Sequence, residues 1–511
     1  MPLGLLLPMH PMACDDRRNQ RIEELTRGAL DVLIVGGGIV GSGVARDAAM
    51  RGLRVGLVEQ YDMAFGTSSR SSRLLHGGMR YLAQGRIGLV REASREKRVL
   101  HRIAPHLAQP LAFVFPSYRG SGWPLWMLRM GVKVYDLLCG GRNLGPSSSL
   151  SAGELLVYLP RPNPEGLTGA VRYYDGLTND ARLVLDTLRS AAGYGAILCN
   201  YVRLEDAVRT SAGWECHLRD TLADRPFEVQ ARCVVNATGP WAQTLPHSSI
   251  KLRLTKGIHL VVDRGRLPIA DAVVMIQGDR ILFAIPWGER VILGTTDTDY
   301  QGPLDAVAVE KPDVDYVLGV AAHAFPAAQL DERDVRSTWA GLRPLIAGGR
   351  GGPSDISRAH EIRTPQPAWI DVAGGKLTTY RLIAQQVVDR VLRELGEAAR
   401  PCRTAQEPLS APELVEGRSA IVPPAPSAKL VEQYCAEEWA VHLDDVMLRR
   451  SGWHYYRADA ASVAEQVAGW MAELLGWDRA QQDAELARYQ AATRLWQETV
   501  VEEHSRGNEN G

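Results

Sequence analysis

The sequence predicts an α/β protein that carries a second, antiparallel sheet and a small helical C-terminal region. Three observations lead to this prediction. A short apolar strand, a glycine-rich turn and a helix follow one another from residue 31. Apolar and polar residues alternate through residues 251–300, which is typical of antiparallel strands. Residues 429–500 are rich in Ala, Glu, Leu and Trp with a helical pattern, behind a linker rich in Pro, Ser and Glu at 401–428.

The first of these segments is a βαβ unit. Asp31–Val35 and Leu53–Val58 are apolar runs typical of buried parallel strands. Ile39–Arg51 between them has the small apolar residues of a packed helix. Glu59 closes the second strand, so strand, glycine turn, helix, strand and acid follow in the order that dinucleotide-binding units use.

The glycine turn has the sequence Gly36-Gly37-Gly38-Ile39-Val40-Gly41. Gly36 permits the tight turn, Gly38 lets the backbone approach a pyrophosphate, and Gly41 lets helix and strand pack closely. The unpaired N–H groups and the dipole of the helix N-terminus favour an anion there. The Glu59 carboxylate accepts hydrogen bonds from ribose hydroxyls and repels a 2′-phosphate, so the unit predicts a dinucleotide other than NADP. The alternative is a glycine turn that serves packing alone.

Other elements follow from the same patterns. We expect helices at Ile87–Ile103, Asp180–Ala192 and Leu377–Leu395, and two strands within Phe227–Ala237. Gly66–Tyr81 is dense in hydroxyls and small residues, which suits a loop beside a ribityl–phosphate chain, although a solvated serine-rich loop has the same composition.

Composition limits the classes of partner. Among 511 residues, 58 Lys and Arg nearly balance 59 Asp and Glu, so the global basic field that attracts nucleic acid is absent. The seven cysteines form no CxxC pair and fit no zinc ligand set, so no metal is expected. Residues 1–30 lack the features of a signal peptide, and no apolar run reaches the ~18–20 residues that cross a bilayer. We therefore expect a cytoplasmic protein.

Ser71–Tyr81 resembles the signature of the FAD-dependent glycerol-3-phosphate dehydrogenases, the respiratory and NAD-independent family. Further segments resemble the same family in the same order and cover the chain from about residue 30 to 390. They are Val235–Trp241, Lys256–His259, Gly294–Asp297, Gly341–Leu345 and Gly374–Arg381.

The resemblance implies a flavin-binding domain of the glutathione-reductase type beside a substrate domain built on an antiparallel sheet. The FAD-binding domain would be assembled from residues 30–105, 180–250 and 355–395. The substrate domain would comprise residues 106–179 and 251–354, and residues 429–500 would form the helical C-terminal region.

The resemblance also assigns residues to FAD. Asn236–Gly239 would end a strand near the cofactor, and Gly374–Thr378 would meet the flavin ring at a helix N-terminus, whose dipole stabilises negative charge on the reduced ring. The expected cofactor-binding residues are Gly36, Gly38, Gly41, Glu59, Thr67, Ser68, Ser72, Leu74, Gly77, Gly78, Gly239, Gly374, Gly375, Leu377 and Thr378.

The implied reaction is the oxidation of glycerol 3-phosphate at C2 to dihydroxyacetone phosphate, with hydride passing from C2 to flavin N5. A phosphate needs a cationic cradle, for which the candidates are Arg80, Arg343 and Arg358, with Lys376 near the flavin. Tyr81 and Thr296 are candidate hydroxyl contacts.

The candidate base is His76, or alternatively His259, since imidazole titrates near ~6.5. His76 is preferred because it stands between the flavin loop and Arg80-Tyr81. A histidine that only hydrogen-bonds the cofactor or stabilises the loop is the other interpretation.

The family passes its electrons to membrane quinone or, in some relatives, to oxygen. Basic residues gather in or beside the expected helix Ile87–Ile103, and Trp123–Leu138 mixes Trp, Leu, Met and Tyr with Arg129 and Lys133. These segments predict peripheral association with an anionic inner-membrane surface. A solvated helix and a packed helix would have similar sequences. The basic residues are Arg86, Arg91, Arg95, Lys97, Arg98 and Arg102.

The region after Arg381 is shorter than the family's usual helical cap, which leaves dimerisation and the quinone site open; a homodimer is one hypothesis. Two other functions also stay open. One is an FAD-dependent oxidase or dehydrogenase of another small alcohol, amine or hydroxy acid on the same fold, although the basic set favours a phosphate. The other is a non-catalytic flavin-bound regulatory protein, against which the complete glycine turn, His76 and Lys376 argue.

Overall fold

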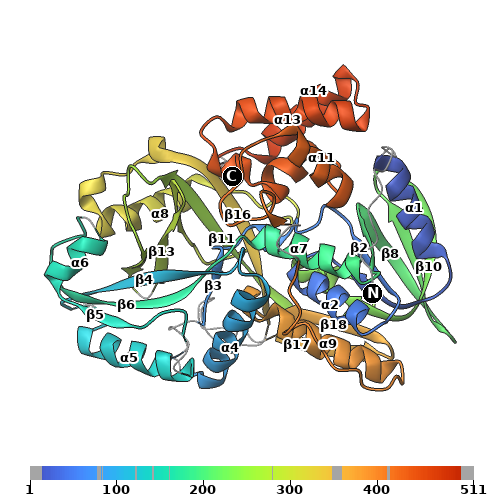
Figure 1. Ribbon diagram of the computed structural model, residues 1–511, viewed down its shortest axis with the longest axis horizontal. Coiled ribbons are helices and arrows are strands. Elements are labelled where there is room, and N and C mark those ends of the chain that lie inside the picture. The colour runs from blue at the N-terminus through green and yellow to red at the C-terminus, as the bar shows by residue number, and fades with distance from the viewer. Residues whose placement is uncertain are drawn as a thin grey trace, which may run out of the picture.

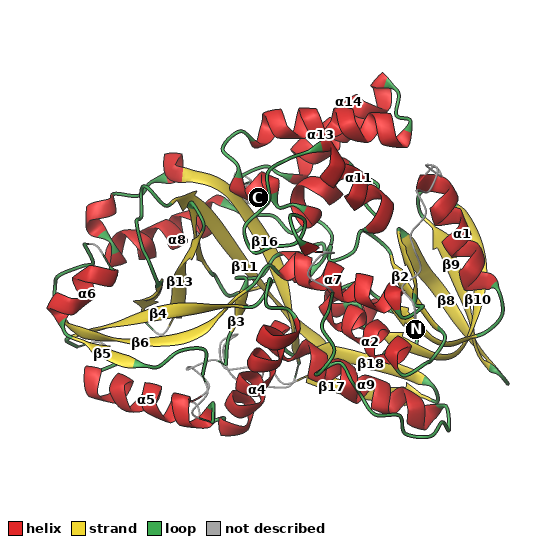
Figure 2. Ribbon diagram, viewed as in Figure 1, coloured by secondary structure: helices red, strands yellow, loops and turns green. Residues whose placement is uncertain are grey.

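The computed structural model describes residues 14–77, 82, 85–120, 123–140, 143–159, 161–278, 280–347, 360–410 and 415–496. Two sheets lie side by side, and the helical C-terminal region packs above them (Figure 1). Helices flank the strands of both sheets (Figure 2). Within the described residues, no helix combines the length and the apolar character that a membrane span requires.

The first sheet contains the expected βαβ unit. Its strands run in the order β17-β18-β10-β1-β2-β7, and the β8–β9 hairpin extends from β10. Neighbours from β18 to β7 are parallel. The strands are β1 (Leu30–Val35), β2 (Val55–Glu59), β7 (Ile197–Asn200), β8 (Val202–Thr210), β9 (Gly213–Asp220), β10 (Arg225–Asn236), β17 (His360–Gln366) and β18 (Trp369–Gly374).

Apolar side chains of this sheet are buried on both faces, as expected for parallel strands. Helices α2 (Ile39–Met50), α7 (Asp180–Gly193) and α9 (Tyr380–Glu394) pack on one face against residues such as Ile34 and Val235. Helix α1 (Cys14–Thr26) and the β8–β9 hairpin cover the other face.

The expectation of two strands within Phe227–Ala237 was wrong, because β10 is one continuous strand. Its first half, Arg225–Ala231, pairs antiparallel with β9, and its second half, from Ala231, pairs parallel with β1. One strand therefore pairs with an antiparallel neighbour along its first half and with a parallel neighbour along its second half. The expected helix Leu377–Leu395 instead begins with a short 3₁₀ turn, Leu377–Thr379, before α9.

The second sheet is largely antiparallel, which confirms the alternation seen in residues 251–300. Its order is β15-β11-β14-β13-β12-β4-β6-β3, with β16 on β11 and β5 on β6. The strands are β3 (Leu74–Leu75), β4 (Gln109–Tyr118), β5 (Ser148–Leu150), β6 (Leu167–Leu177), β11 (Leu252–Asp263), β12 (Ala272–Gln277), β13 (Arg280–Trp287), β14 (Arg290–Gly294), β15 (Thr298–Asp299) and β16 (Val335–Ile346).

Helices cover the two faces of this sheet. Helix α8 (Lys311–Ala324) packs on one face, while α5 (Leu125–Leu138) packs on the other, beside α4 (Ile87–Ile103) (Figure 1). The helix α6 (Ala152–Tyr158) contacts β6. The expected bounds of α4 are confirmed, but Lys97 is not on its basic surface: the ammonium group is buried and pairs with Asp175.

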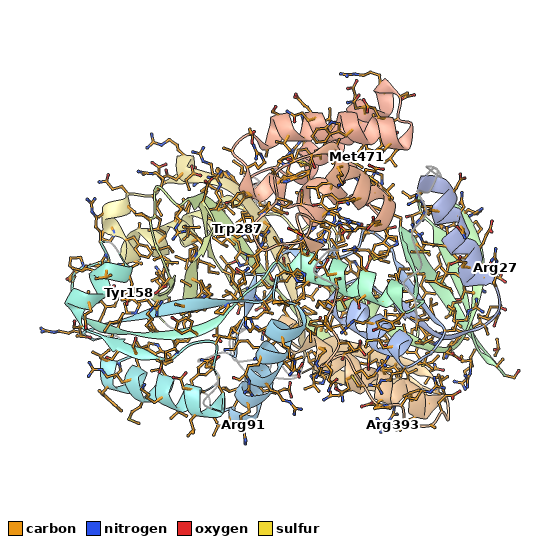
Figure 3. The ribbon with its side chains drawn as sticks, viewed as in Figure 1. Arg27, Arg91, Tyr158, Trp287, Arg393 and Met471 are labelled. Atoms are coloured by element: carbon orange, nitrogen blue, oxygen red, sulfur yellow. The ribbon has the colours of Figure 1, made fainter. Side chains whose placement is uncertain are left out.

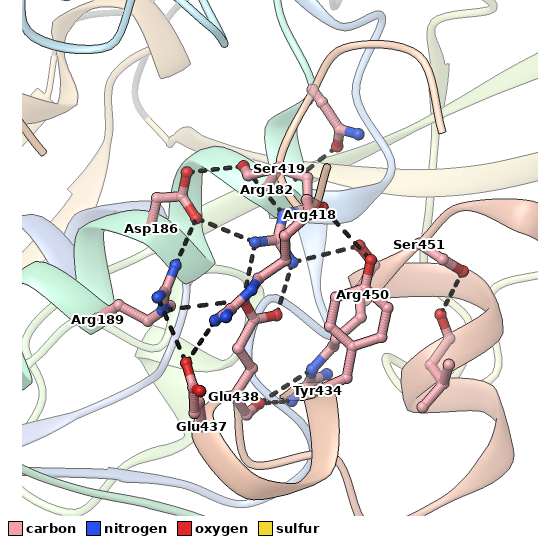
Figure 4. A network of polar contacts seen from close by, with 12 residues as sticks. Arg182, Asp186, Arg189, Arg418, Ser419, Tyr434, Glu437, Glu438, Arg450 and Ser451 are labelled. Atoms are coloured by element: carbon pink, nitrogen blue, oxygen red, sulfur yellow. Dashed lines mark hydrogen bonds and ion pairs between the residues drawn. The ribbon is translucent and has the colours of Figure 1, made fainter. Parts of the chain in front are cut away.

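The C-terminal region is joined to the first sheet by a buried ionic network (Figure 4). Arg182 on α7 donates to both carboxylate oxygens of Glu438 at 2.6 and 2.9 Å and to Asp186 at 3.0 Å. Arg450 in turn donates to the carbonyl oxygen of Glu438. The elements of this region are α11 (Ala428–Glu437), a π-helical turn (Asp445–Arg450), α12 (Trp453–Tyr456), α13 (Ala460–Leu475) and α14 (Arg479–Ala492). The division of the chain into domains at the expected boundaries stays a prediction.

Candidate active site

A cavity of about 440 Å³ lies between the two sheets and receives residues from both. One end is lined by the turn after β1 and by the acid that closes β2. The other end is lined by β11, β16 and the segment that follows β18. The expected site residues that line it are Gly36, Gly38, Glu59, Thr67, Ser68, Ser72, Leu74, His76, Gly239, His259, Arg343, Gly374, Gly375, Lys376, Leu377 and Thr378.

Three expected site residues are described but do not line this cavity. Gly41 lies in α2 beneath the turn, and Gly77 packs against Tyr135. Thr296 is buried, and its hydroxyl accepts the N–H of Ile258 at 3.1 Å. Gly78, Arg80, Tyr81 and Arg358 lie outside the described residues.

The glycine turn has the geometry that the spacing of its glycines predicts. Gly36 has φ +113°, and its N–H donates to the carbonyl oxygen of Val58 at 2.8 Å. A Cβ on Gly41 would overlap the carbonyl oxygen of Gly36, so only glycine allows this close approach of helix and turn. Gly38 is the N-cap of α2, and no side chain caps the helix at that position. Ser68 Oγ accepts the N–H of Ile39, the first residue of the helix, at 3.0 Å, so the serine-rich loop already satisfies one donor at this end. The remaining N–H groups of the first turn and the helix dipole favour an anion there.

Glu59 supports the turn as well as facing the cavity. Its carboxylate accepts the N–H of Gly37 at 2.7 Å and the N–H of Tyr61 at 3.0 Å. Burial raises the pKa of Glu59, although these backbone hydrogen bonds act in the opposite direction. Each carboxylate oxygen keeps a further lone pair, which ribose hydroxyls can use.

The segment after β18 turns sharply at two glycines. Gly374 and Gly375 have φ +73° and +84°, a conformation that side chains disfavour. The 3₁₀ turn and α9 follow, so Lys376 stands at a helical N-terminus that faces the cavity. Thr378 in this turn accepts the backbone N–H of His76 at 3.1 Å. The two loops therefore meet at the cavity wall.

His259 lies on β11 with both ring nitrogens enclosed. Nε2 is 2.8 Å from the hydroxyl of Ser72, and the buried Nδ1 has no hydrogen-bond partner within the described part of the chain. The ring stacks on Trp339 at 5.1 Å between centroids. Burial, followed by the nearby charges of Arg343 and Arg73, lowers the pKa of His259 well below its ordinary value. His259 is thus a neutral imidazole near pH 7.

Arg343 on β16 presents its guanidinium group to the cavity. It donates to the carbonyl oxygen of Thr296 at 3.1 Å, to Thr295 Oγ1 at 2.9 Å and to the Asp297 carboxylate at 3.1 Å. A Cβ on Gly257 of the neighbouring strand would overlap the guanidinium group, so the absence of a side chain there makes room for it. These three protein atoms fix its orientation without burying it completely.

Some cavity residues were not selected from the sequence. Asp180 begins α7 and accepts the N–H of Ser71 at 2.9 Å, which anchors the serine-rich loop. Arg70 in that loop lies over the ring of Phe65, and burial lowers its pKa. Trp241 follows Gly239, and Arg203 and Glu205 come from β8. In the sequence, only the serine-rich composition of its loop indicates a role for Arg70. No local pattern indicates one for Asp180, because Ser71, whose N–H it accepts, is distant in sequence.

The residues present fit a dinucleotide cofactor of the flavin type. The helix N-terminus at Gly38 suits a pyrophosphate, and Glu59 suits a ribose. The hydroxyls of Thr67, Ser68 and Ser72 line the path toward the second helix N-terminus at Lys376. The path ends beside Arg343 and the two histidines, where a small substrate would meet the far end of the cofactor.

Comparisons with known proteins agree with this arrangement. The model of the family described as FAD dependent oxidoreductase matches residues 31–389, and that of the C-terminal domain of alpha-glycerophosphate oxidase matches residues 376–482. The aerobic glycerol-3-phosphate dehydrogenase of Bacillus subtilis (strain 168) is 38% identical over 404 residues, which are 77% of this chain and 73% of that protein. The protein of the same name from Staphylococcus aureus (strain MRSA252) is 36% identical over 409 residues, with the same two coverages of 77% and 73%.

A solved structure extends the likeness to most of the chain. The glycerol-3-phosphate dehydrogenase of Bacillus halodurans complexed with FAD has a TM-score of 0.75 at 28% identity, over 94% of this chain and 97% of that chain. The cofactor is FAD, and the chain belongs to the FAD-dependent oxidoreductases, in the family that includes the aerobic glycerol-3-phosphate dehydrogenases.

Proposed function

We propose that this protein oxidises sn-glycerol 3-phosphate to dihydroxyacetone phosphate and passes the electrons to a quinone-type acceptor. The observation that carries the proposal is that one cavity is lined both by the FAD-binding turn and by Arg343, His76 and Lys376. The names of the relatives supply the substrate class. When bound, FAD would supply the two-electron acceptor for the hydride that leaves C2, with N5 as the accepting atom.

Arg343 would bind the substrate phosphate. A guanidinium group pairs with phosphate oxygens through two parallel N–H donors, and the three hydrogen bonds that Arg343 makes to Thr295, Thr296 and Asp297 fix the plane of this fork in advance. Arg80 and Arg358 stay predicted members of the same cradle. Lys376, at the helical N-terminus, would place positive charge beside the reduced cofactor.

His76 would remove the proton of the C2 hydroxyl. Its backbone is held by Thr378 beside the cofactor segment, and the residue lines the cavity. His259 is the alternative base, but its Nε2 already contacts Ser72 and its Nδ1 is buried, so it would have to act through the Ser72 hydroxyl. The preference for His76 rests on its place in the loop that meets the cofactor segment at Thr378.

The experiment uses the purified FAD-loaded protein under anaerobic conditions. Addition of glycerol 3-phosphate should bleach the flavin absorbance and yield one dihydroxyacetone phosphate per flavin. Glycerol, lactate and glycine serve as controls, because each lacks the phosphate. Bleaching by one of those compounds but not by glycerol 3-phosphate would favour another oxidase of this fold. A flavin that no substrate bleaches would favour a non-catalytic protein.

The outer face of α5 would contact the membrane that holds the quinone. Trp126, Met130, Val134 and Leu137 lie on one helical face, and their side chains are exposed by 63%, 61%, 41% and 75%. The spacing puts them on the side opposite Leu128, Val132 and Tyr135, which pack on the sheet. Large exposed apolar faces of this kind mark sites of contact.

Basic residues surround this apolar face. Arg129 and Lys133 are exposed on α5 itself, and Arg91 and Arg95 are exposed on the adjacent α4, where Arg91 lies at the outer edge (Figure 3). Each basic residue near an anionic lipid surface contributes about 1 kcal/mol to binding. The combination of apolar side chains and cations favours an anionic bilayer surface.

Co-sedimentation with vesicles tests the surface. The wild type should bind phosphatidylglycerol vesicles at low salt, and the variant Trp126→Ser/Leu137→Ser should bind far less. The matched variant Val208→Ser/Leu222→Ser removes two exposed apolar side chains, one from β8 and one from the turn between β9 and β10, and should bind like the wild type. A wild type that stays wholly in the supernatant, both here and in cell fractionation at low salt, would refute membrane association.

A further inference from the structure

The loop that carries His76 leaves the second sheet abruptly. Strand β3 pairs antiparallel with β6, so that Leu74 is opposite Leu177 and Leu75 is opposite Gly176. The pairing ends there, one residue before Asp175 of β6 would be reached. Gly77 is nevertheless buried. A buried N–H group needs a partner, so the N–H of Gly77 requires one from outside the ladder.

Side chains supply this partner. The N–H of Gly77 donates to the hydroxyl of Tyr135 at 3.1 Å and lies 3.4 Å from Oδ1 of Asp175. The Tyr135 hydroxyl donates to the same Oδ1 at 2.6 Å. Tyr135 comes from the inner face of α5, and Asp175 comes from β6. Two elements thus converge on one peptide unit of the loop.

A buried cation fixes the carboxylate. Nζ of Lys97 is 2.6 Å from Asp175 Oδ1 and also donates to Asn143 Oδ1 at 2.9 Å. Lys97, Tyr135 and Asp175 are exposed by 1%, 0% and 2%, so water does not compete for these contacts. Burial, and then the charge of Asp175, raises the pKa of Tyr135 well above its ordinary value. Its hydroxyl therefore stays protonated, so it can donate a hydrogen bond to Asp175 and accept one from the N–H of Gly77.

Contact between the loop and Tyr135 is very close. A Cβ on Gly77 would overlap the Tyr135 hydroxyl and approach Ser94 Oγ to 3.1 Å. On the other side of His76, Thr378 accepts its N–H at 3.1 Å and lies 3.3 Å from its carbonyl oxygen. The backbone is therefore held both at His76 itself and at the following residue.

We propose that Tyr135, fixed by Asp175 and Lys97, is a positioning residue that holds the Gly77 end of this loop and so directs the His76 imidazole into the cavity. The inference rests on the proposed function, in which His76 is the base. Geometry of this kind matters because a displacement of about 1 Å at a reacting group can slow a reaction ~10²-fold. Tyr135 touches neither substrate nor cofactor, and it acts through Gly77.

Tyr135→Phe is the appropriate variant. It removes the hydroxyl and leaves the buried Lys97–Asp175 pair intact, whereas loss of either charge would destabilise the fold. The matched control is Tyr173→Phe. Tyr173 is a buried tyrosine of β6 whose ring lies 6.1 Å from that of Tyr135 and whose hydroxyl has no hydrogen bond within the described part of the chain.

The kinetic measurement is the anaerobic rate of flavin reduction by glycerol 3-phosphate. In Tyr135→Phe the rate at saturation should fall about tenfold while the apparent KM changes by less than about twofold, since only the alignment of the base is altered. The pH of half-maximal rate should shift as well. FAD content and melting temperature should match those of Tyr173→Phe, and Tyr173→Phe should keep the wild-type rate and pH profile.

Amide hydrogen exchange gives a readout that needs no substrate. Deuterium uptake by the peptide that contains Leu75–Gly77 should rise in Tyr135→Phe but not in Tyr173→Phe. Unchanged uptake would overturn the inference, and so would increased uptake with an unchanged rate per bound flavin and an unchanged pH profile. If glycerol 3-phosphate does not bleach the wild type, the proposed function fails, and the exchange measurement alone decides whether Tyr135 holds the loop.

Discussion

The hydroxyl of Thr378 accepts the backbone N–H of His76 at 3.1 Å, across 302 residues of sequence. Thr378 belongs to the 3₁₀ turn that begins α9, next to the Gly374-Gly375 turn. His76 belongs to the loop that leaves β3. One hydrogen bond therefore connects the segment that would meet the flavin ring with the candidate base.

Replacement of Thr378 by Val should slow the reaction while preserving the fold. Valine has nearly the same shape but cannot accept the N–H of His76, and a buried hydrogen bond contributes about 1 kcal/mol. If that free energy is lost in the transition state, the rate of flavin reduction by glycerol 3-phosphate should fall about fivefold to tenfold. Stopped-flow absorbance measures it. Thr378→Ser retains the acceptor and should react like the wild type, and a valine variant as fast as the serine variant would contradict the link.

Arg343→Ala should weaken substrate binding. If the guanidinium group pairs with the phosphate, KM for glycerol 3-phosphate should rise ~10²-fold or more, equivalent to roughly 2.7 kcal/mol. Arg343→Lys should fall between the alanine variant and the wild type, because a lysine cannot form the bidentate fork. Steady-state kinetics with an artificial electron acceptor gives these values.

Two further variants isolate the role of Arg343. Alanine at position 343 also removes the ion-pair partner of the Asp297 carboxylate, which would then repel the substrate phosphate. The double variant Arg343→Ala/Asp297→Asn removes this repulsion and shows how much of the rise in KM it causes. Arg253→Ala breaks an exposed ion pair with Asp299 on the neighbouring strands and should leave KM within about twofold of the wild type. A KM that Arg343→Ala leaves unchanged would remove Arg343 from the phosphate site.

The cofactor end of the site could be predicted from the sequence because its signals are local. The strand, turn and helix of the βαβ unit are adjacent in sequence. The glycines Gly36, Gly38 and Gly41 have steric roles that depend on residues close to them in this unit. Within the alternating residues 251–300, β12 and β13 likewise each pair with the strand that follows in sequence.

The substrate end depends on contacts that the sequence does not encode locally. Thr296 was expected to touch substrate, but it is buried and its hydroxyl accepts the N–H of Ile258 on the neighbouring β11. Lys97 was expected on a basic surface, but the turn of α4 directs it inward to Asp175. A lysine on an amphipathic helix has the same local pattern whether it faces water or a buried carboxylate, so only the tertiary structure separates the two cases.

Two glycines of the turn should respond differently to alanine. At Gly38, φ is −80° and a Cβ would lie 3.3 Å from Ser68 Oγ, which can rotate away. Gly38→Ala should therefore fold but bind FAD at least about tenfold more weakly, because its methyl group enters the pyrophosphate path. At Gly41 a Cβ overlaps the Gly36 carbonyl, so Gly41→Ala should lose ~1–3 kcal/mol of stability as well as FAD.

Fluorescence titration with FAD and thermal unfolding of the cofactor-free protein measure the two effects. Gly319→Ala is the control, because Gly319 lies in α8 with open space around its Cα. It should leave FAD affinity unchanged and stability equal or slightly higher, since Ala is the better helix former by about 0.5–1 kcal/mol. Equal stability of Gly38→Ala and Gly41→Ala would contradict the steric difference between the two positions.

His454 should make the C-terminal region sensitive to acid. Burial lowers the pKa of His454 to about 4, from an ordinary value of 6.5. Between these two values the unfolded chain binds a proton that the folded protein does not. The free energy of unfolding therefore decreases as the pH falls from about 6.5 to about 4, by about 3 kcal/mol, with little further change below pH 4 or above pH 6.5.

His454→Gln should flatten this dependence, because glutamine can still hydrogen-bond the hydroxyl of Tyr489, which lies 2.8 Å from Nδ1 in the wild type. Melting temperatures recorded from about pH 4.5 to pH 7.5 test the effect, and the loss at low pH should be smaller in the variant. Tyr489→Phe is the matched control: it loses the same hydrogen bond but keeps the imidazole, so it should be less stable at every pH with the wild-type slope. If the melting temperature depends on pH equally in His454→Gln and Tyr489→Phe, a group other than His454 must titrate, because only His454→Gln removes the imidazole.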